Sequence, residues 1–163
     1  GKKLDEFLAG NDFIVQEGVR ANQLKNHNYD IRVLVQKDIG GRWTITGMVS
    51  RIAHEQYFNT SIYEMVCSTE QILDRLFPAG KAKSAVIDAI YNTSIEAARI
   101  VEKGTGLMGE LSIDYMLDGD MNLWIIEING KPQKSIYKDA MRFDYEYLAY
   151  SRPLEYAYYL ATH

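Results

Sequence analysis

Two carboxylates and one amide have the residue types and the spacing that could bind a divalent cation. Asp114 lies in the largely apolar run Leu111–Leu117, Glu127 lies in a second run, Leu123–Ile128, and Asn129 follows that run directly. Side chains alternate between the two faces of a strand, so Glu127 and Asn129 share one face of theirs. What these residues can do depends on how the two runs pair.

A β-hairpin is the expected arrangement, because the polar segment 119–122 between the two runs is typical of a turn. If the turn is centred on this segment, Asp114 faces Glu127 and Ser112 faces Asn129. Like charges directly opposite each other destabilise a sheet, whereas a cation between them would favour the pairing. Two carboxylates and an amide oxygen suit Mg²⁺ that holds a phosphate. The pattern is equally consistent with an acidic stripe on a solvated hairpin face that never binds a metal.

A second hairpin could place arginines beside a phosphate. Gly40-Gly41 is a two-residue turn signal, and the register that it sets places Asp30 opposite Arg51, with Arg32 on the same face. The fixed, forked donors of arginine match phosphate oxygens. A plain cross-strand ion pair between Asp30 and Arg51, worth under about 1 kcal/mol if exposed, is the simpler interpretation. Lys131 could reach a phosphate as a point charge or lie in solvent.

The remaining patterns predict helices between and after the hairpins. A Ser–Gln capping box opens a helix at Ser68, and an amphipathic helix is expected over Lys83–Lys103. The aromatic stretch Tyr145–Leu160 predicts helix, with Pro153 at the start of a final helix. The chain, residues 1–163, is thus predicted to be a single α+β domain, an antiparallel sheet covered by helices. The other expected elements are a helix end at Leu4–Leu8, a short strand at Phe13–Gln16, a loop over 20–29, and hairpin strands over 30–37, 43–53, 111–117 and 123–128.

Composition and charge exclude several classes of protein. A net charge of −4 leaves no basic excess for a polynucleotide, and no apolar run approaches the roughly 20 residues that a membrane helix needs. The single cysteine, Cys67, cannot form an internal disulfide, and together with three histidines it does not make a zinc site. We therefore expect a reducing, cytoplasmic setting, with neither nucleic acid nor membrane as a partner.

Segments spread over most of the chain resemble a known group of proteins. Asp114 on one strand and Glu127-Ile128-Asn129 on the next, followed by Gly130-Lys131-Pro132, are similar to the metal-binding end of the ATP-grasp superfamily. The surrounding sequence is similar to the YheC/YheD group of endospore coat-associated ATP-grasp proteins, from about Phe13 to Leu160. Four segments in this order carry the resemblance: Phe13–Val19, Tyr29–Lys37, Gly41–Gly47 and Gly109–Asp114.

The resemblance implies the C-terminal lobe of an ATP-grasp fold that uses ATP and Mg²⁺. The implied reaction is phosphorylation of a small-molecule carboxylate by ATP, followed by attack of an amine or similar nucleophile on the acyl phosphate. Such chemistry needs positioning and charge neutralisation more than a protein nucleophile. The implied roles are adenine contacts from a hinge at Gln16, Glu17 and Val19, phosphate or acyl-phosphate contacts from the catalytic Arg32 and Arg51, and magnesium ligands Asp114, Glu127 and Asn129. From the residues alone, Lys131 is added as a candidate nucleotide contact.

The sequence departs from the group's pattern in two places. Relatives usually follow the arginine of the second strand with an asparagine and then a Gly-Gly loop, whereas Asn59-Thr60-Ser61 follows Arg51 here without the glycines. A first lobe, with its phosphate-binding lysine and glycine-rich loop, should precede the hinge strand, and this chain begins at Gly1, shortly before that strand. We therefore expect the chain alone to bind Mg-ATP weakly and to show no turnover.

A second interpretation is a structural or interaction component of a spore that retains an ATP-grasp fold. The missing Gly-Gly loop and the tyrosine-rich segment Tyr145–Tyr159 favour it, and the protein would then be spore-associated, with other coat proteins as partners. These tyrosines could form an assembly surface or cover the sheet as ordinary core. Their spacing alone favours the core.

Overall fold

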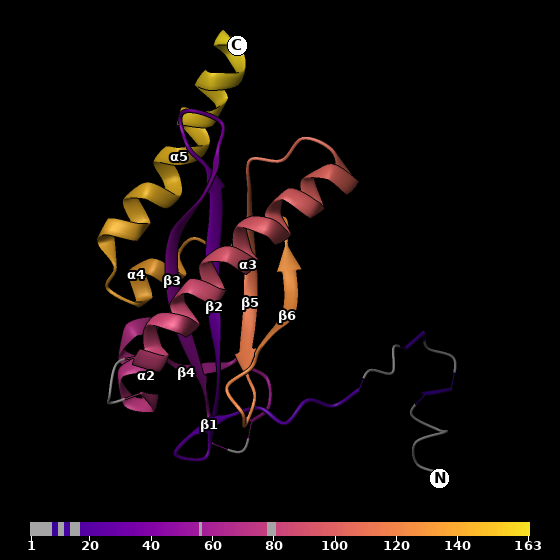
Figure 1. The fold of residues 1–163 in the computed structure, drawn as a ribbon, viewed down its shortest axis with the longest axis vertical. Coiled ribbons are helices and arrows are strands. Elements are labelled where there is room, and N and C mark those ends of the chain that lie inside the picture. Colours follow the sequence, from indigo (N-terminus) through magenta and orange to yellow (C-terminus); the bar gives the residue numbers. More distant parts are fainter. Residues whose placement is uncertain (1–7, 10–11, 14–16, 56, 78–80) are drawn as a thin grey trace.

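The chain forms one antiparallel β-sheet with helices on both faces (Figure 1). The computed structural model describes residues 8–9, 12–13, 17–55, 57–77 and 81–163. The strands are β1 (Gln23–Leu24), β2 (His27–Lys37), β3 (Trp43–Ala53), β4 (Tyr63–Ser68), β5 (Glu110–Leu117) and β6 (Leu123–Asn129). The helices are α2 (Thr69–Leu76), α3 (Lys81–Thr105), α4 (Ile136–Asp139) and α5 (Phe143–Thr162). No helix in this part of the chain is both long and apolar enough to cross a membrane.

The centre of the sheet is β2, which pairs with β3 on one side and with β5 on the other. The strand order is β4-β3-β2-β5-β6, and the short β1 pairs with β2. β3 follows β2 directly through a hairpin, whereas β5 follows only after β4, α2 and α3. β2 and β5 are therefore neighbours in space although they lie far apart in the sequence (Figure 1).

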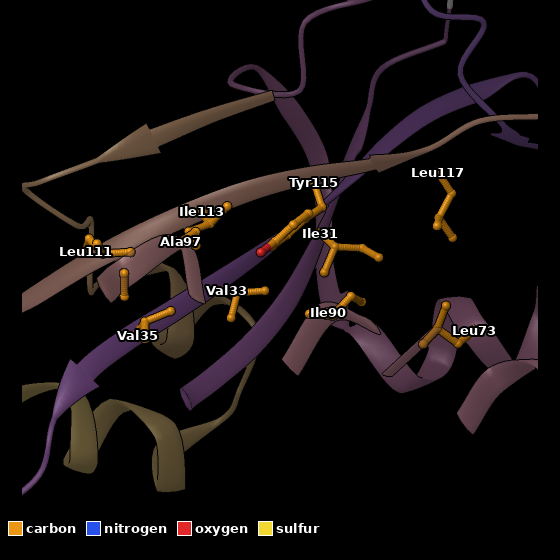
Figure 2. Packing of buried hydrophobic residues seen from close by; sticks show 11 residues of the cluster. Ile31, Val33, Val35, Leu73, Ile90, Ala97, Leu111, Ile113, Tyr115 and Leu117 are labelled. Carbon is orange, nitrogen blue, oxygen red and sulfur yellow. The ribbon is translucent and has the colours of Figure 1, made fainter. Parts of the chain in front are cut away.

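One face of the sheet packs against α2 and α3 and forms the main hydrophobic core (Figure 2). Alternate residues of β2, namely Ile31, Val33 and Val35, are fully buried there. α3 crosses this face and contributes Ile90 and Ala97 from the apolar stripe that its sequence predicts. The 3.6-residue period of this helix thus determines which side of it meets the sheet.

The opposite face is covered in part, by α4 and α5. Leu34 of β2 and Val49 of β3 pack there against Ile136 and Tyr137 of α4 and Ala149 of α5. Since Leu34 alternates with Val33 along β2, the same strand supplies both cores.

Two glycines allow α5 to approach the sheet closely. A Cβ at Gly47 would lie 2.6 Å from the ring of Tyr145, so any side chain there would displace α5. Gly41 has a φ of +72° and lies under the ring of Tyr159, where a Cβ would be 2.7 Å away. The turn conformation and the close contact both require glycine at this position.

Pro153 lies inside α5 and does not start a final helix, so that part of the prediction is wrong. A proline in a helix lacks the N–H that would bond to the carbonyl four residues earlier, which here is that of Ala149. The Gln36 side chain supplies the missing donor, with its Nε2 2.9 Å from the Ala149 oxygen. The Gln36 Oε1 accepts from Thr46 Oγ1 at 2.6 Å. A fully buried glutamine of β2 therefore replaces one helical bond and joins α5 to the sheet.

The α+β class, the two hairpins and the Lys83–Lys103 helix are confirmed, with bounds that differ by a few residues. The predicted cap is also confirmed, because the Ser68 side chain accepts a hydrogen bond from the backbone N–H of Gln71 at 3.3 Å. The expected strand Phe13–Gln16 and the helix end at Leu4–Leu8 lie largely outside the described residues.

The expected loop over 20–29 is wrong in part, because β1 pairs with β2 across a two-residue turn. Lys25 and Asn26 have φ values of 52° and 72°, which is the left-handed geometry of a tight hairpin turn. Asparagine tolerates this geometry, and lysine adopts it here without a local signal in the sequence. The strand β4 was not predicted either.

Replacing Gln36 by leucine should destabilise the protein, because the Ala149 carbonyl then stays buried without a donor. We expect the free energy of unfolding to fall by about 1–3 kcal/mol, measured by urea denaturation. Pro153→Ala restores a backbone N–H that can reach Ala149, so the double variant should recover part of the loss. Gln133→Leu, at an exposed glutamine, is the control and should change stability by less than about 0.5 kcal/mol. Equal losses in the single and double variants would show that Gln36 does not replace the helical bond.

Candidate functional site

The β5–β6 hairpin has the register that its turn predicts near its carboxylates. Asp114 pairs with Glu127 and Ser112 pairs with Asn129. Because side chains alternate along each strand, the two acids and the amide lie on one face. This is the face that α4 and α5 cover only in part.

Two further pairings bring arginines to the same place. The β2–β3 register places Asp30 opposite Arg51, as predicted. The β2–β5 register places Arg32 opposite Asp114, which the sequence did not predict. Charged residues from β2, β3, β5 and β6 thus meet in one cluster.

Arg32 binds Asp114 through two parallel hydrogen bonds. Its Nε lies 2.7 Å from Asp114 Oδ1, and its Nη2 lies 2.6 Å from Oδ2. The two side chains are only 9% and 2% exposed. The same Nη2 lies 3.8 Å from Glu127 Oε1, so the guanidinium is a cation that both facing carboxylates share. The facing of two acids across the hairpin therefore does not by itself demand a metal ion, contrary to the argument from sequence.

Arg51 holds a second carboxylate in the same cluster. Its Nε donates to Asp30 Oδ1 at 3.0 Å, and its Nη2 donates both to Asp30 Oδ2 and, at 2.7 Å, to Asp114 Oδ2. Thr60 Oγ1 also donates to Asp30 Oδ2, at 2.7 Å. The Arg51 and Asp30 side chains are 5% and 1% exposed, so this is not the weak surface pair of the simpler interpretation. Removing one partner of a buried pair costs about 3–5 kcal/mol.

The cluster stabilises the charged forms of Asp114 and Arg51. Burial raises the pKa of Asp114, but the hydrogen bonds and positive charges of Arg32 and Arg51 outweigh burial and hold this pKa below its ordinary value. Burial lowers the pKa of Arg51, whereas the hydrogen bonds and charges of Asp30 and Asp114 raise it above its ordinary value. Arg51 and Asp114 are thus held as charged partners of each other inside the cluster.

Glu127 and Asn129 complete the predicted set of oxygen donors. The Glu127 side chain is 53% exposed, and its Oε1 accepts from Asn129 Nδ2 at 2.9 Å, so the Asn129 amide oxygen takes no part in this bond. The neighbouring Ser112 Oγ is buried without a hydrogen-bond partner in the described part of the chain. Within that part, no three His, Cys, Asp or Glu side chains form a metal-binding group. The two carboxylates and the amide nonetheless fit a hard cation such as Mg²⁺ by donor type.

An apolar cavity of about 310 Å³ adjoins the cluster. Met116, two residues after Asp114, and Ile126, directly before Glu127, line one side of it, and Asp30 lines it from β2. The other lining residues are Ala21, Asn28, Tyr29, Phe58, Asn59 and Thr60. A flat apolar ring in this cavity would lie beside Asp30, the carboxylate that Arg51 binds.

The predicted hinge and lysine contacts remain predictions. Gln16 lies outside the described residues; Glu17 is exposed and Val19 is half-buried. Neither Glu17 nor Val19 lines the cavity, which the chain reaches two residues later, at Ala21. Lys131 is exposed, and within the described residues no hydrogen bond or ion pair joins it to the cluster.

Sequence reasoning missed most residues that line the cavity, and three of them differ in the signal that the sequence offers. Met116 had a signal, because the strand period places it on the same face as Asp114. Ile126 had none, because it is the extra residue of a β-bulge where the pairing shifts from Asp114 opposite Glu127 to Tyr115 opposite Ile125. Thr60 lies in a loop, and its bond to Asp30 depends on the path of that loop.

The antiparallel sheet, with an acid on one strand and Glu-x-Asn on its neighbour, agrees with the ATP-grasp fold that the sequence resemblance implies. The sequence profile described as "YheC/D like ATP-grasp" matches residues 1–160, and the chain therefore belongs to this family.

Two curated relatives come from Bacillus subtilis (strain 168). The chain is 25% identical to the endospore coat-associated protein YheD over 151 residues, which cover 92% of this chain and 33% of that protein. It is 23% identical to the endospore coat-associated protein YheC over 129 residues, which cover 77% of this chain and 35% of that protein. The chain thus spans about a third of the length of each relative.

Proposed function

We propose that this chain is the ATP- and Mg²⁺-binding part of an ATP-dependent carboxylate–amine ligase. The observation that carries the proposal is the buried cluster of Arg32, Arg51 and Asp114. Through Asp30, which Arg51 binds, the cluster adjoins an apolar cavity. A nucleotide needs an apolar pocket for its base and fixed cations for its phosphates. Membership of the ATP-grasp family supports the proposal, because that family generally binds ATP and Mg²⁺.

In this proposal the base enters the cavity between Met116 and Ile126, and the phosphates lie toward the arginines. Arg32 and Arg51 bind phosphate oxygens with forked donors. The proposed magnesium ligands are Asp114, Glu127 and Asn129. Gln16, Glu17 and Val19 stay proposed as hinge contacts to adenine, although Glu17 and Val19 do not line the cavity in the chain without nucleotide. Lys131 is a further proposed phosphate contact.

The proposed reaction transfers the terminal phosphoryl group of ATP to a substrate carboxylate, which gives ADP and an acyl phosphate. An amine then attacks the acyl carbon and releases inorganic phosphate. Bound Mg²⁺ would neutralise the charge on the phosphate oxygens during transfer. The chain's own arginines would orient the phosphoryl group and stabilise its charge, and their burial strengthens this interaction. No protein nucleophile is required.

Filling the cavity should weaken binding of the base but not of the phosphates. We expect Met116→Trp to lower the affinity of the chain for Mg-ATP by about tenfold, as for loss of a well-packed contact, and to leave Mg-tripolyphosphate binding unchanged. Calorimetry at millimolar ligand measures both, since the isolated chain is expected to bind weakly. Met141→Trp, at a methionine that is 77% exposed, is the control. An equal loss for both ligands, or no loss for ATP, would place the base elsewhere.

Ligase activity is tested with the natural full-length protein and a panel of carboxylic acids. Hydroxylamine captures an acyl phosphate as a hydroxamate and releases phosphate. We expect hydroxamate to form only with ATP and one class of acid, and to be lost in Arg51→Met. Its absence across a broad panel would count against the ligase.

A second candidate function, a structural or interaction component of the spore coat, is favoured by one observation. Some tyrosines of α5 pack on the sheet, as Tyr145 and Tyr156 do, but others point outward. Tyr147, Tyr150 and Tyr158 are 73%, 54% and 65% exposed. The names of both relatives place them at the endospore coat. If hydroxamate fails to form with every acid tested, this candidate, with coat proteins as partners, becomes the better one.

A further inference from the structure

We infer that the Arg32–Asp114 pair keeps the metal position closed until phosphates draw Arg32 away, so that divalent metal and nucleotide bind together and each alone binds weakly. This inference rests on the proposed function and adds a rule for how the same site fills. It assigns Arg32 two successive partners, Asp114 in the free protein and phosphate in the loaded one.

The first support is that both Asp114 oxygens are already engaged. Arg32 donates to Oδ1 and Oδ2, and Arg51 adds a second bond to Oδ2. With 2% of its side chain exposed, Asp114 presents almost no surface to an ion arriving from solvent. A metal ion arriving alone must therefore displace a buried, bidentate guanidinium or bind Glu127 and Asn129 without Asp114.

The second support is that the two arginines are held unequally. Arg51 is bound to Asp30 as well as to Asp114, and Thr60 bonds to the same Asp30 oxygen. Among the residues that the structure describes, Arg32 has close hydrogen bonds to Asp114 alone, while Glu127 lies 3.8 Å away. Arg32 is therefore the one that a phosphate can detach without leaving a buried aspartate bare, because Arg51 still neutralises Asp114.

The third support is the charge balance of the cluster. Asp30, Asp114 and Glu127 carry three negative charges against the two positive charges of the arginines. A divalent ion placed at Asp114 would lie next to Arg32, and a polyphosphate placed at Arg32 would lie next to Asp114 and Glu127. The metal ion alone thus meets the positive charge of Arg32, and the polyphosphate alone meets the negative charges of Asp114 and Glu127. When both bind, they neutralise each other, Arg32 binds the phosphates and Asp114 binds the metal ion. By linkage, each ligand must then tighten the binding of the other by the same factor.

The test measures the binding of Mn²⁺ to the chain in the absence of nucleotide. Electron paramagnetic resonance reports the concentration of free Mn²⁺. We expect Arg32→Met to bind Mn²⁺ about 10- to 100-fold more tightly than the unmodified chain, the range over which partners of metal ligands typically act. Arg42→Met is the matched control, since it removes one arginine that is 83% exposed and pairs with Asp38. The net charge changes equally in both variants. The double variant Arg32→Met with Asp114→Asn should lose the gain.

A second readout guards against misfolding of Arg32→Met. Its melting temperature should rise on addition of Mn²⁺, while that of the unmodified chain should stay nearly constant. Arg32→Lys keeps the charge but loses the paired bonds, so its Mn²⁺ affinity should lie between those of the two proteins. Tight Mn²⁺ binding by the unmodified chain, or no gain in Arg32→Met and Arg32→Lys, would overturn the inference.

Failure of this inference differs from failure of the proposed function. If the unmodified chain binds Mg-ATP but also binds Mn²⁺ alone as tightly as Arg32→Met does, the inference is wrong and nucleotide binding stands. The other outcome is that neither the unmodified chain nor any variant binds ATP in calorimetry, while Arg32→Met still gains Mn²⁺ affinity. In that case the Arg32–Asp114 pair closes a metal position, but the nucleotide proposal is wrong.

Discussion

The antiparallel pairing of β2 with β5 is the feature on which the site depends. It sets Arg32 against Asp114, and Arg51 then reaches the same carboxylate from β3. Burying these charges is costly, and only their mutual hydrogen bonds offset that cost. The opposite side of the same strands is an apolar core against α3 (Figure 2). One set of strands thus provides a rigid support on one face and a charged site on the other.

The sequence predicted those strand pairings that depend on residues close together in the chain. Turn signals determine local registers, and so the facing pairs Asp114–Glu127 and Asp30–Arg51 were predictable before the fold was known. The Arg32–Asp114 pair was not, because it depends on a crossover through α2 and α3. The same limit applies to Pro153: its place inside α5 is possible because the distant Gln36 replaces the lost bond.

The α5 helix packs on the second face of the sheet with some of its tyrosines and exposes others to solvent. Gly47 allows the Tyr145 ring of α5 to pack closely on the sheet, and no α5 residue lines the cavity beside the charged cluster in the described part of the chain. Of the outward tyrosines of α5, Tyr147 and Tyr158 are 73% and 65% exposed, whereas the Tyr150 ring also contacts the Lys134 ammonium. The proposed nucleotide site and the exposed tyrosines of α5 lie on one domain, so the two proposed functions are compatible.

The proposal that the β5–β6 face holds the metal of a bound nucleotide can be tested by nuclear magnetic resonance of the ¹⁵N-labelled chain with Mn²⁺ and a non-hydrolysable ATP analogue. Paramagnetic broadening should begin at the amides of Asp114, Glu127 and Asn129, at substoichiometric metal and only when the analogue is present. Broadening that begins instead at the exposed hairpin turn around Asp120, or that is the same with and without the analogue, would show that the metal binds elsewhere.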